Sequence, residues 1–243
     1  MKRLVLFVVA ALVMMVGATF CSFAGTKPTD FQRIVFDDHV FKTEDGSFRQ
    51  LSSTPFRLEA PTADQLFAET VCIPEPVVQL YNMSGGSIRF VDKPFFVTWN
   101  NMQLGGYCLY DTWDIQVSVE APWLDGGGVS NIMEIRDAAR RFTHETGHFL
   151  HHRTMSLWTD TERQALRELC AYYEGDGTFA RLRAEGYSED ELDDEAFAIA
   201  FETWFGHGES VIPTEEQVAL PSSSKALMDY CTVLSNYIMI TAG

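Results

Sequence analysis

The stretch HETGHFLHH, residues 144–152, places four of the six histidines of this 243-residue chain within nine positions, around one glutamate. It ends a longer run, residues 131–152, that begins with a plausible capping box of Asn131 and Glu134. Apolar residues recur along this run at helical spacing: Ile132, Ile135, Ala139, Phe142 and Phe149. The pattern predicts a buried or half-buried helix that carries the histidines.

The segment from His144 to His148 matches the motif H-E-x-x-H. Helix residues four apart lie one turn above each other, so both imidazoles can bind the same zinc ion. Glu145 lies beside them, where it can act as a base toward a metal-bound water. The structural alternative is a polar helix face with solvated histidines, and the apolar stripe of this helix argues against it.

His151 and His152 cannot easily complete the same site. Along a helix they lie about 10 to 12 Å beyond His144, whereas zinc binds nitrogen at about 2.0 to 2.1 Å. We expect them to be polar residues at the helix C-terminus, with support of a metal ligand or contact with substrate as the alternative. Metalloproteases with an extended third-histidine motif need glycine at 151 and histidine at 154. The chain has His151 and Thr154, which excludes that class.

A third ligand can come from the acidic stretch SEDELDDEAFAIAFETWFGHG, residues 188–208. Glu195 begins a strongly apolar helix, so it is the carboxylate most readily drawn toward the core, where a metal can be its partner. The alternative is a first-turn glutamate favoured by the helix dipole. Glu202 lies two turns further along the same face and can orient a ligand histidine. The remaining acidic residues are expected to form a solvated cap: Glu191, Asp193 and Asp194.

These two motifs together resemble the catalytic domain of the anthrax toxin lethal factor-like zinc peptidases, which include the secreted Pro-Pro endopeptidases. An H-E-x-x-H helix is followed about 45 residues later by EAFAIAF, similar to the E-F-F-A-E-A-F helix of that family. The resemblance covers roughly residues 60–243. It implies His144 and His148 as zinc ligands, Glu195 as the third ligand and Glu145 as the catalytic base.

The resemblance also concerns a strand and a tyrosine. WDIQVSVE, residues 113–120, alternates apolar and polar residues, which predicts a strand buried on one face and wet on the other. The resemblance implies that this is the edge strand beside which a peptide would lie. Family members have a tyrosine seven residues before the third ligand, where it stabilises the transition state. Here that position is Ser188, and the adjacent Tyr187 is the candidate for this role.

The first 24 residues have the features of a secretory signal. Lys2 and Arg3 precede an apolar run from Leu4 to Val16, and small residues lead up to Ala24. The run is short for a bilayer, which needs about 20 apolar residues. We expect cleavage after Ala24, secretion to an extracellular or periplasmic location, and no membrane attachment of the mature protein.

The rest of the chain predicts one compact domain with a leading arm. Residues 25–60 form the arm, in which TEDGS marks the turn of a short hairpin, and residues 61–243 form the catalytic domain. The expected class is α+β: a zincin-like domain with a small mixed sheet and an active-site helix carrying the H-E-x-x-H motif. Further helices are indicated by the pairs Thr159 with Glu162 and Ser188 with Glu191.

The net charge of the chain limits its possible partners. The chain carries a net charge of −16, and the leader contains only basic charges, so the mature protein is more acidic still. Nucleic acids and anionic membranes are therefore poor partners, and we expect a monomer that binds a peptide or protein substrate.

The four cysteines of the mature chain predict two disulfides, most simply Cys72 with Cys108 and Cys170 with Cys231, the alternative being buried free thiols.

The sequence as a whole predicts a secreted zinc endopeptidase that hydrolyses peptide bonds with a zinc-activated water and Glu145 as general base. An aminopeptidase or another metal-dependent hydrolase is an alternative within enzymes. An exported interaction module with a structural or vestigial zinc site is the alternative from a different class.

Overall fold

A computed structural model describes residues 72–242 with gaps at 92–94, 98–101, 119–134 and 207–213, together with three short strands within residues 34–50. The expected leader and the cap at Asn131 lie outside the described residues. The strands are β1 (Ile34–Phe36), β2 (Val40–Lys42), β3 (Phe48–Gln50), β4 (Ile88–Val91), β5 (Phe95–Val97), β6 (Met102–Leu104), β7 (Gly106–Leu109) and β8 (Asp114–Ser118). The helices are α3 (Glu75–Ser84), α4 (Ile135–Thr154), α5 (Asp160–Gly175), α6 (Thr178–Glu185), α7 (Leu192–Phe205), α8 (Glu215–Ala219) and α9 (Ser222–Ala242), with short 3-10 turns η2 (Met155–Leu157) and η3 (Glu189–Glu191).

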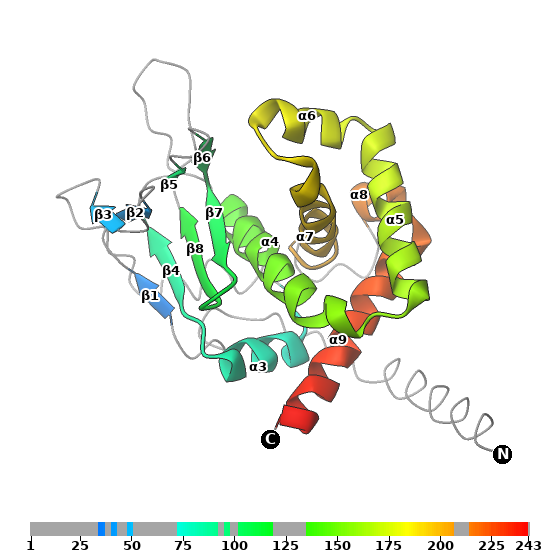
Figure 1. Ribbon diagram of the computed structural model, residues 1–243, viewed down its shortest axis with the longest axis horizontal. Coiled ribbons are helices and arrows are strands. Elements are labelled where there is room, and N and C mark those ends of the chain that lie inside the picture. The colour runs from blue at the N-terminus through cyan, green and yellow to red at the C-terminus, as the bar shows by residue number, and fades with distance from the viewer. Residues whose placement is uncertain are drawn as a thin grey trace.

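The described chain is mostly helical, with one mixed sheet to one side (Figure 1). The strand order is β1-β4-β8-β7; β4 runs parallel to β1 and β8, and β7 runs antiparallel to β8. Strands β2 and β3 pair as the hairpin expected around TEDGS. The expected α+β class with a small mixed sheet is confirmed.

The expectation that residues 113–120 form an edge strand is wrong. β8 lies between β4 and β7, so β7 is the edge of the sheet on this side within the described residues. Gln116 is buried along with Ile115 and Val117, so the second face of β8 is also not wet at this position. The pattern of a single strand does not reveal its neighbours, because strand pairing joins residues far apart in sequence.

Helix α4 lies at the centre of the fold, with the sheet on one side and α7 on the other (Figure 1). On the sheet side, the Phe149 ring packs edge-on against Tyr81 and Trp113, with centroids 4.9 and 5.4 Å away. The buried Thr146 inside α4 is satisfied within the helix, since its hydroxyl donates to the carbonyl of Phe142 at 2.8 Å. The helix is thus buried on more than one face, and its histidine side packs against α7.

Helices α4 and α7 run antiparallel and approach each other closely at Gly147. A Cβ atom at this position would lie 2.9 Å from the Ala198 Cα, which is closer than packed atoms come, and 3.1 Å from the Phe201 Cβ, which is a tight contact. The glycine in HETGH therefore lets the two helix backbones approach. This approach brings the acidic face of α7 against the histidines.

The ends of the helices next to the site follow the sequence signals. Thr159 with Glu162 caps α5, and Ser188 with Glu191 caps the η3 turn that leads into α7; both are complete capping boxes. Among the described residues, none of the helices is long and apolar enough to cross a membrane.

The predicted disulfides are not formed, and the four cysteines among the described residues are all free. The Cys170 thiol on α5 donates to Asp193 at 3.2 Å, whereas the Cys231 sulfur on α9 accepts from the Thr154 hydroxyl on α4. These two thiols thus contact different neighbouring helices. Cys72 and Cys108 are buried separately, before α3 and on β7.

The close approach at Gly147 makes this residue a test of the packing. Gly147→Ala should lower the free energy of unfolding by about 1 to 3 kcal/mol, because its methyl group meets the α7 backbone. Gly175→Ala on α5 is the matched control, since a Cβ there meets nothing within 4 Å. Thermal unfolding of both variants measures the difference, and equal melting temperatures would contradict this account of the helix packing.

Candidate metal centre

The two histidines of the motif face each other across one turn of α4. Their Nε2 atoms lie 3.1 Å apart, with the rings at a steep angle to one another. Two imidazole nitrogens at this distance repel unless a proton or a metal ion lies between their lone pairs. His144 and His148 are largely buried, so water cannot easily screen that repulsion.

Glu195 of α7 completes the group. Its two carboxylate oxygens lie 3.4 Å from His144 Nε2 and 3.4 Å from His148 Nε2. The three side chains each offer a ligand atom, and these atoms lie within 4.8 Å of one another. The structure thus brings together the three predicted ligands, and the cluster could bind a metal ion.

The second nitrogen of each ring faces another carboxylate of α7. His144 Nδ1 lies 3.4 Å from Glu202, which accepts a 2.7 Å hydrogen bond from Arg140. His148 Nδ1 lies 3.0 Å from Asp194. Carboxylates in such positions fix the orientation of metal-binding imidazoles and make them stronger donors.

The placement of Glu202 agrees with its predicted role, but the assignment of Asp194 to a solvated cap is wrong. The Asp194 side chain is 15% exposed and contacts His148, His151 and His152. Asp193 next to it is exposed. The Ser188–Glu191 pair caps the η3 turn that precedes α7.

The electrostatics of the cluster favour a positive charge between the carboxylates. Burial alone would lower the pKa of His144, yet Glu195 and Glu202 outweigh it and raise this pKa to about 10. Burial would likewise raise the pKa of Glu195, but His148 and His144 lower it to about 2. The donor set and its charge therefore fit a metal cation.

Glu145 lies on the same helix, against the edge strand β7. An added Cβ at Gly106 would come 2.2 Å from its carboxylate, so any larger residue at this position would force the Glu145 side chain to move. Burial raises the pKa of Glu145 to about 7, partly offset by the two histidines. Sequence reasoning missed Gly106, although the Gly105-Gly106 pair directly before a strand is an available signal of a close approach.

Tyr187 follows α6 and is half-buried against the core. Burial raises its pKa, and the negative charges of Glu195 and Glu145 raise it further. Ser188 cannot take the tyrosine's role because its side chain is engaged in the η3 cap. Tyr187 directly follows a turn in which Gly186 adopts a left-handed conformation, with φ of 110°.

His151 and His152 form a separate group beside the first. His151 Nδ1 lies 2.7 Å from Asp194 Oδ1, and His152 Nε2 lies 3.1 Å from Asp194 Oδ2. We expected that these two histidines would not join the first cluster, and the structure places them in a different group. Their description as helix-terminal polar residues is incomplete, because His151 is buried and both rings contact α7.

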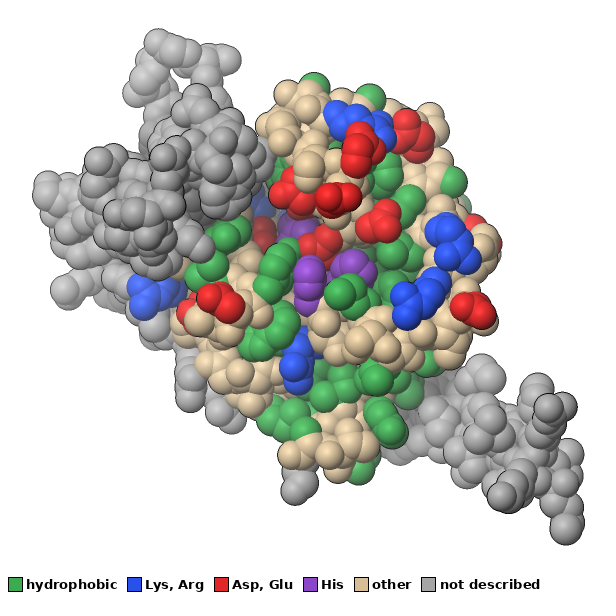
Figure 2. All heavy atoms as spheres, viewed as in Figure 1, with side chains coloured by type: hydrophobic (Ala, Val, Ile, Leu, Met, Phe, Trp, Pro, Cys, Tyr) green, Lys and Arg blue, Asp and Glu red, His purple; other side chains and the backbone are tan. Residues whose placement is uncertain are grey.

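Figure 2 shows histidine side chains gathered in the middle of one face, with acidic side chains directly beside them.

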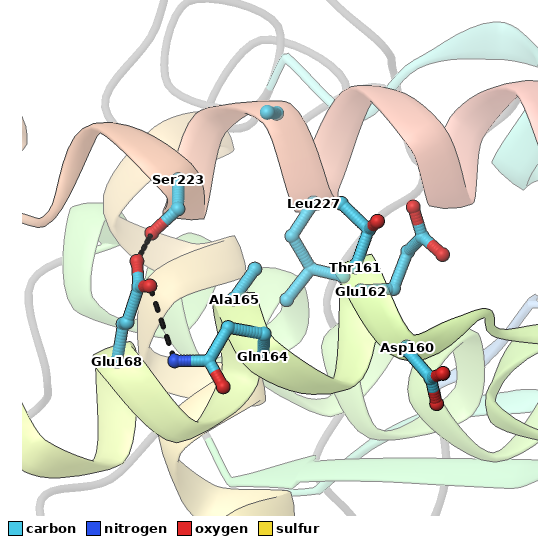
Figure 3. A pocket seen from close by; sticks show the side chains of 9 residues that line it. Asp160, Thr161, Glu162, Gln164, Ala165, Glu168, Ser223 and Leu227 are labelled. Atoms are coloured by element: carbon cyan, nitrogen blue, oxygen red, sulfur yellow. Dashed lines mark hydrogen bonds between the residues drawn. The ribbon is translucent and has the colours of Figure 1, made fainter.

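A pocket elsewhere lies between α5 and α9 (Figure 3), and none of the residues that line it belongs to either histidine cluster. Two of its three carboxylates are engaged locally: Glu168 accepts from Ser223 and Gln164, and Glu162 caps α5. The pocket therefore offers no comparable chemistry.

The sequence matches no model of a known protein family, and no curated protein matches it.

Asp194 and Asp193 form a natural pair for testing the support of His148. Asp194→Asn should weaken metal binding at the site of His148 about 10- to 100-fold, because an amide is a poorer partner for the His148 ring. Asp193→Asn should leave the affinity unchanged. Competition with a chromophoric chelator measures both affinities, and equal values in the two variants would refute the supporting role of Asp194.

Proposed function

We propose that the protein is an exported zinc-dependent endopeptidase. The observation that carries the proposal is the convergence of His144, His148 and Glu195 with Glu145 beside them. Two imidazoles and one carboxylate are a ligand set typical of catalytic zinc, which keeps a further position open for water or substrate. Structural zinc sites are closed by four protein ligands, and the group among the described residues offers three.

When bound, zinc supplies a water whose pKa is lowered to about 7 and polarises the scissile carbonyl. Glu145 accepts the proton of this water and then donates it to the leaving amine. Its raised pKa suits a group that must both take and release a proton near neutral pH. The Tyr187 hydroxyl donates a hydrogen bond to the oxygen that becomes negative in the transition state.

The edge strand β7 is the element on which we expect a peptide to bind. Its backbone groups on the side away from β8 have no partner strand in the described sheet, and an extended peptide can pair with them. Gly106, where β7 begins, lies against Glu145. A peptide paired with β7 would therefore pass directly by the proposed base. This assigns to β7 the role that the family resemblance implied for residues 113–120.

The decisive experiment is cleavage of a peptide library by the purified zinc-loaded protein, read by mass spectrometry. Internal cleavage that stops on chelation and returns with zinc supports the proposal. Release of N-terminal residues only would indicate an aminopeptidase instead. Tight zinc binding with no cleavage of any peptide would contradict the enzyme and favour an interaction module.

Glu145→Gln should retain zinc and lower the rate of hydrolysis at least about 100-fold, because it removes the base while keeping the shape of the side chain. Glu168→Gln, an exposed glutamate on α5, is the control and should keep full activity. Zinc content and kcat are measured on the same samples. Activity of the Glu145 variant near that of the control would reassign the base.

Tyr187→Phe should lower kcat about 100- to 1,000-fold with little change in KM, because the lost hydrogen bond forms only in the transition state. Tyr230→Phe on α9 removes a hydroxyl outside the site and should have no effect on kcat. Should the two variants show the same kcat, Tyr187 has no part in the reaction.

A further inference from the structure

A second group of metal-binding side chains lies next to the first. His151 and His152 at the end of α4 and Asp194 on α7 each offer a ligand atom, and these atoms lie within 4.8 Å of one another. The two imidazole nitrogens already lie 2.7 and 3.1 Å from the oxygens of Asp194. The group has the same composition as the first cluster, two imidazoles and one carboxylate.

Aromatic stacking fixes the His151 and His152 rings, and each ring has one nitrogen facing Asp194. The His151 ring is stacked on Phe197, with centroids 5.0 Å apart and planes 16° from parallel. The His152 ring is stacked on Tyr110 at 3.8 Å and 23°. Donors that are fixed before an ion arrives lose little side-chain entropy on binding.

We propose that His151, His152 and Asp194 form a second, weaker site for a divalent cation such as Zn²⁺. Imidazole nitrogen and carboxylate oxygen suit zinc. The site is weaker than the first because Asp194 is shared: it also faces His148 Nδ1 at 3.0 Å and accepts a hydrogen bond from the Tyr110 hydroxyl. An ion must compete with both contacts.

The His148 ring links the two sites. Its Nε2 belongs to the first cluster, and its Nδ1 faces Asp194. A cation on Asp194 reduces the negative charge opposite Nδ1, which makes His148 a poorer ligand through Nε2. Occupancy of the second site therefore weakens the first, and by linkage the reverse also holds. If the proposed peptidase function is right, excess zinc inhibits hydrolysis.

Counting bound ions tests the second site without any assay of hydrolysis. Metal-free protein is dialysed against buffered Zn²⁺ over a range of free concentrations, and bound zinc is measured by mass spectrometry. Wild type should bind two ions, the second at least about 10-fold more weakly, since the shared carboxylate is part of the first site's support. His152→Ala should bind one, and Ser156→Ala, an exposed control in η2, should bind two.

Wild type that saturates at one ion, or His152→Ala that binds a second ion with wild-type affinity, would overturn the proposal. His152→Asn serves as a second variant, and an unchanged melting temperature of the metal-free protein shows that either variant is folded. The chelator-competition affinity of the first ion should fall as the second binds in wild type but not in His152→Ala. Two bound ions with no peptide cleavage would refute the peptidase function and leave the second site supported.

Discussion

The contact between α4 and α7 at Gly147 is the constraint on which the site depends. With no side chain at Gly147, the Ala198 backbone of α7 can lie directly against α4. On the antiparallel pair, Asp194, Glu195 and Glu202 then face the histidines of α4 in order. A wider separation of the helices would leave these carboxylates too far from the imidazoles to share an ion. The glycine inside the motif is therefore as important for the geometry as the ligands themselves.

The carboxylates around the histidines give this buried cluster an excess of negative charge. Four carboxylates surround the histidines of the motif: Glu145, Asp194, Glu195 and Glu202. Arg140 neutralises part of this charge by pairing with Glu202. Buried like charges repel each other strongly in a medium of low dielectric constant. The remaining negative charge gives the cluster a general preference for cations, which the raised pKa of His144 also reflects.

Local sequence patterns predicted the parts of this arrangement that depend on a single element. The helical stripe and the H-E-x-x-H spacing located α4, and the apolar run after Glu195 located α7 and its inward carboxylate. Asp194 was missed because several acidic residues cluster at this helix start, and only the crossing of α4 and α7 decides which of them turns inward. The edge position of β7 and the free state of the thiols depend on contacts between distant segments, which one unaligned sequence does not contain.

The central claim is that one tightly bound zinc ion is held by His144, His148 and Glu195. X-ray absorption at the zinc edge, on protein loaded with one equivalent of zinc, tests it most directly. The account predicts four-coordinate zinc with two imidazole ligands and oxygen donors, with no sulfur. In Glu195→Ala the imidazole signal should fall or the zinc should be lost. Spectra that show thiolate ligands, or that stay the same when Glu195 is replaced, would contradict the account.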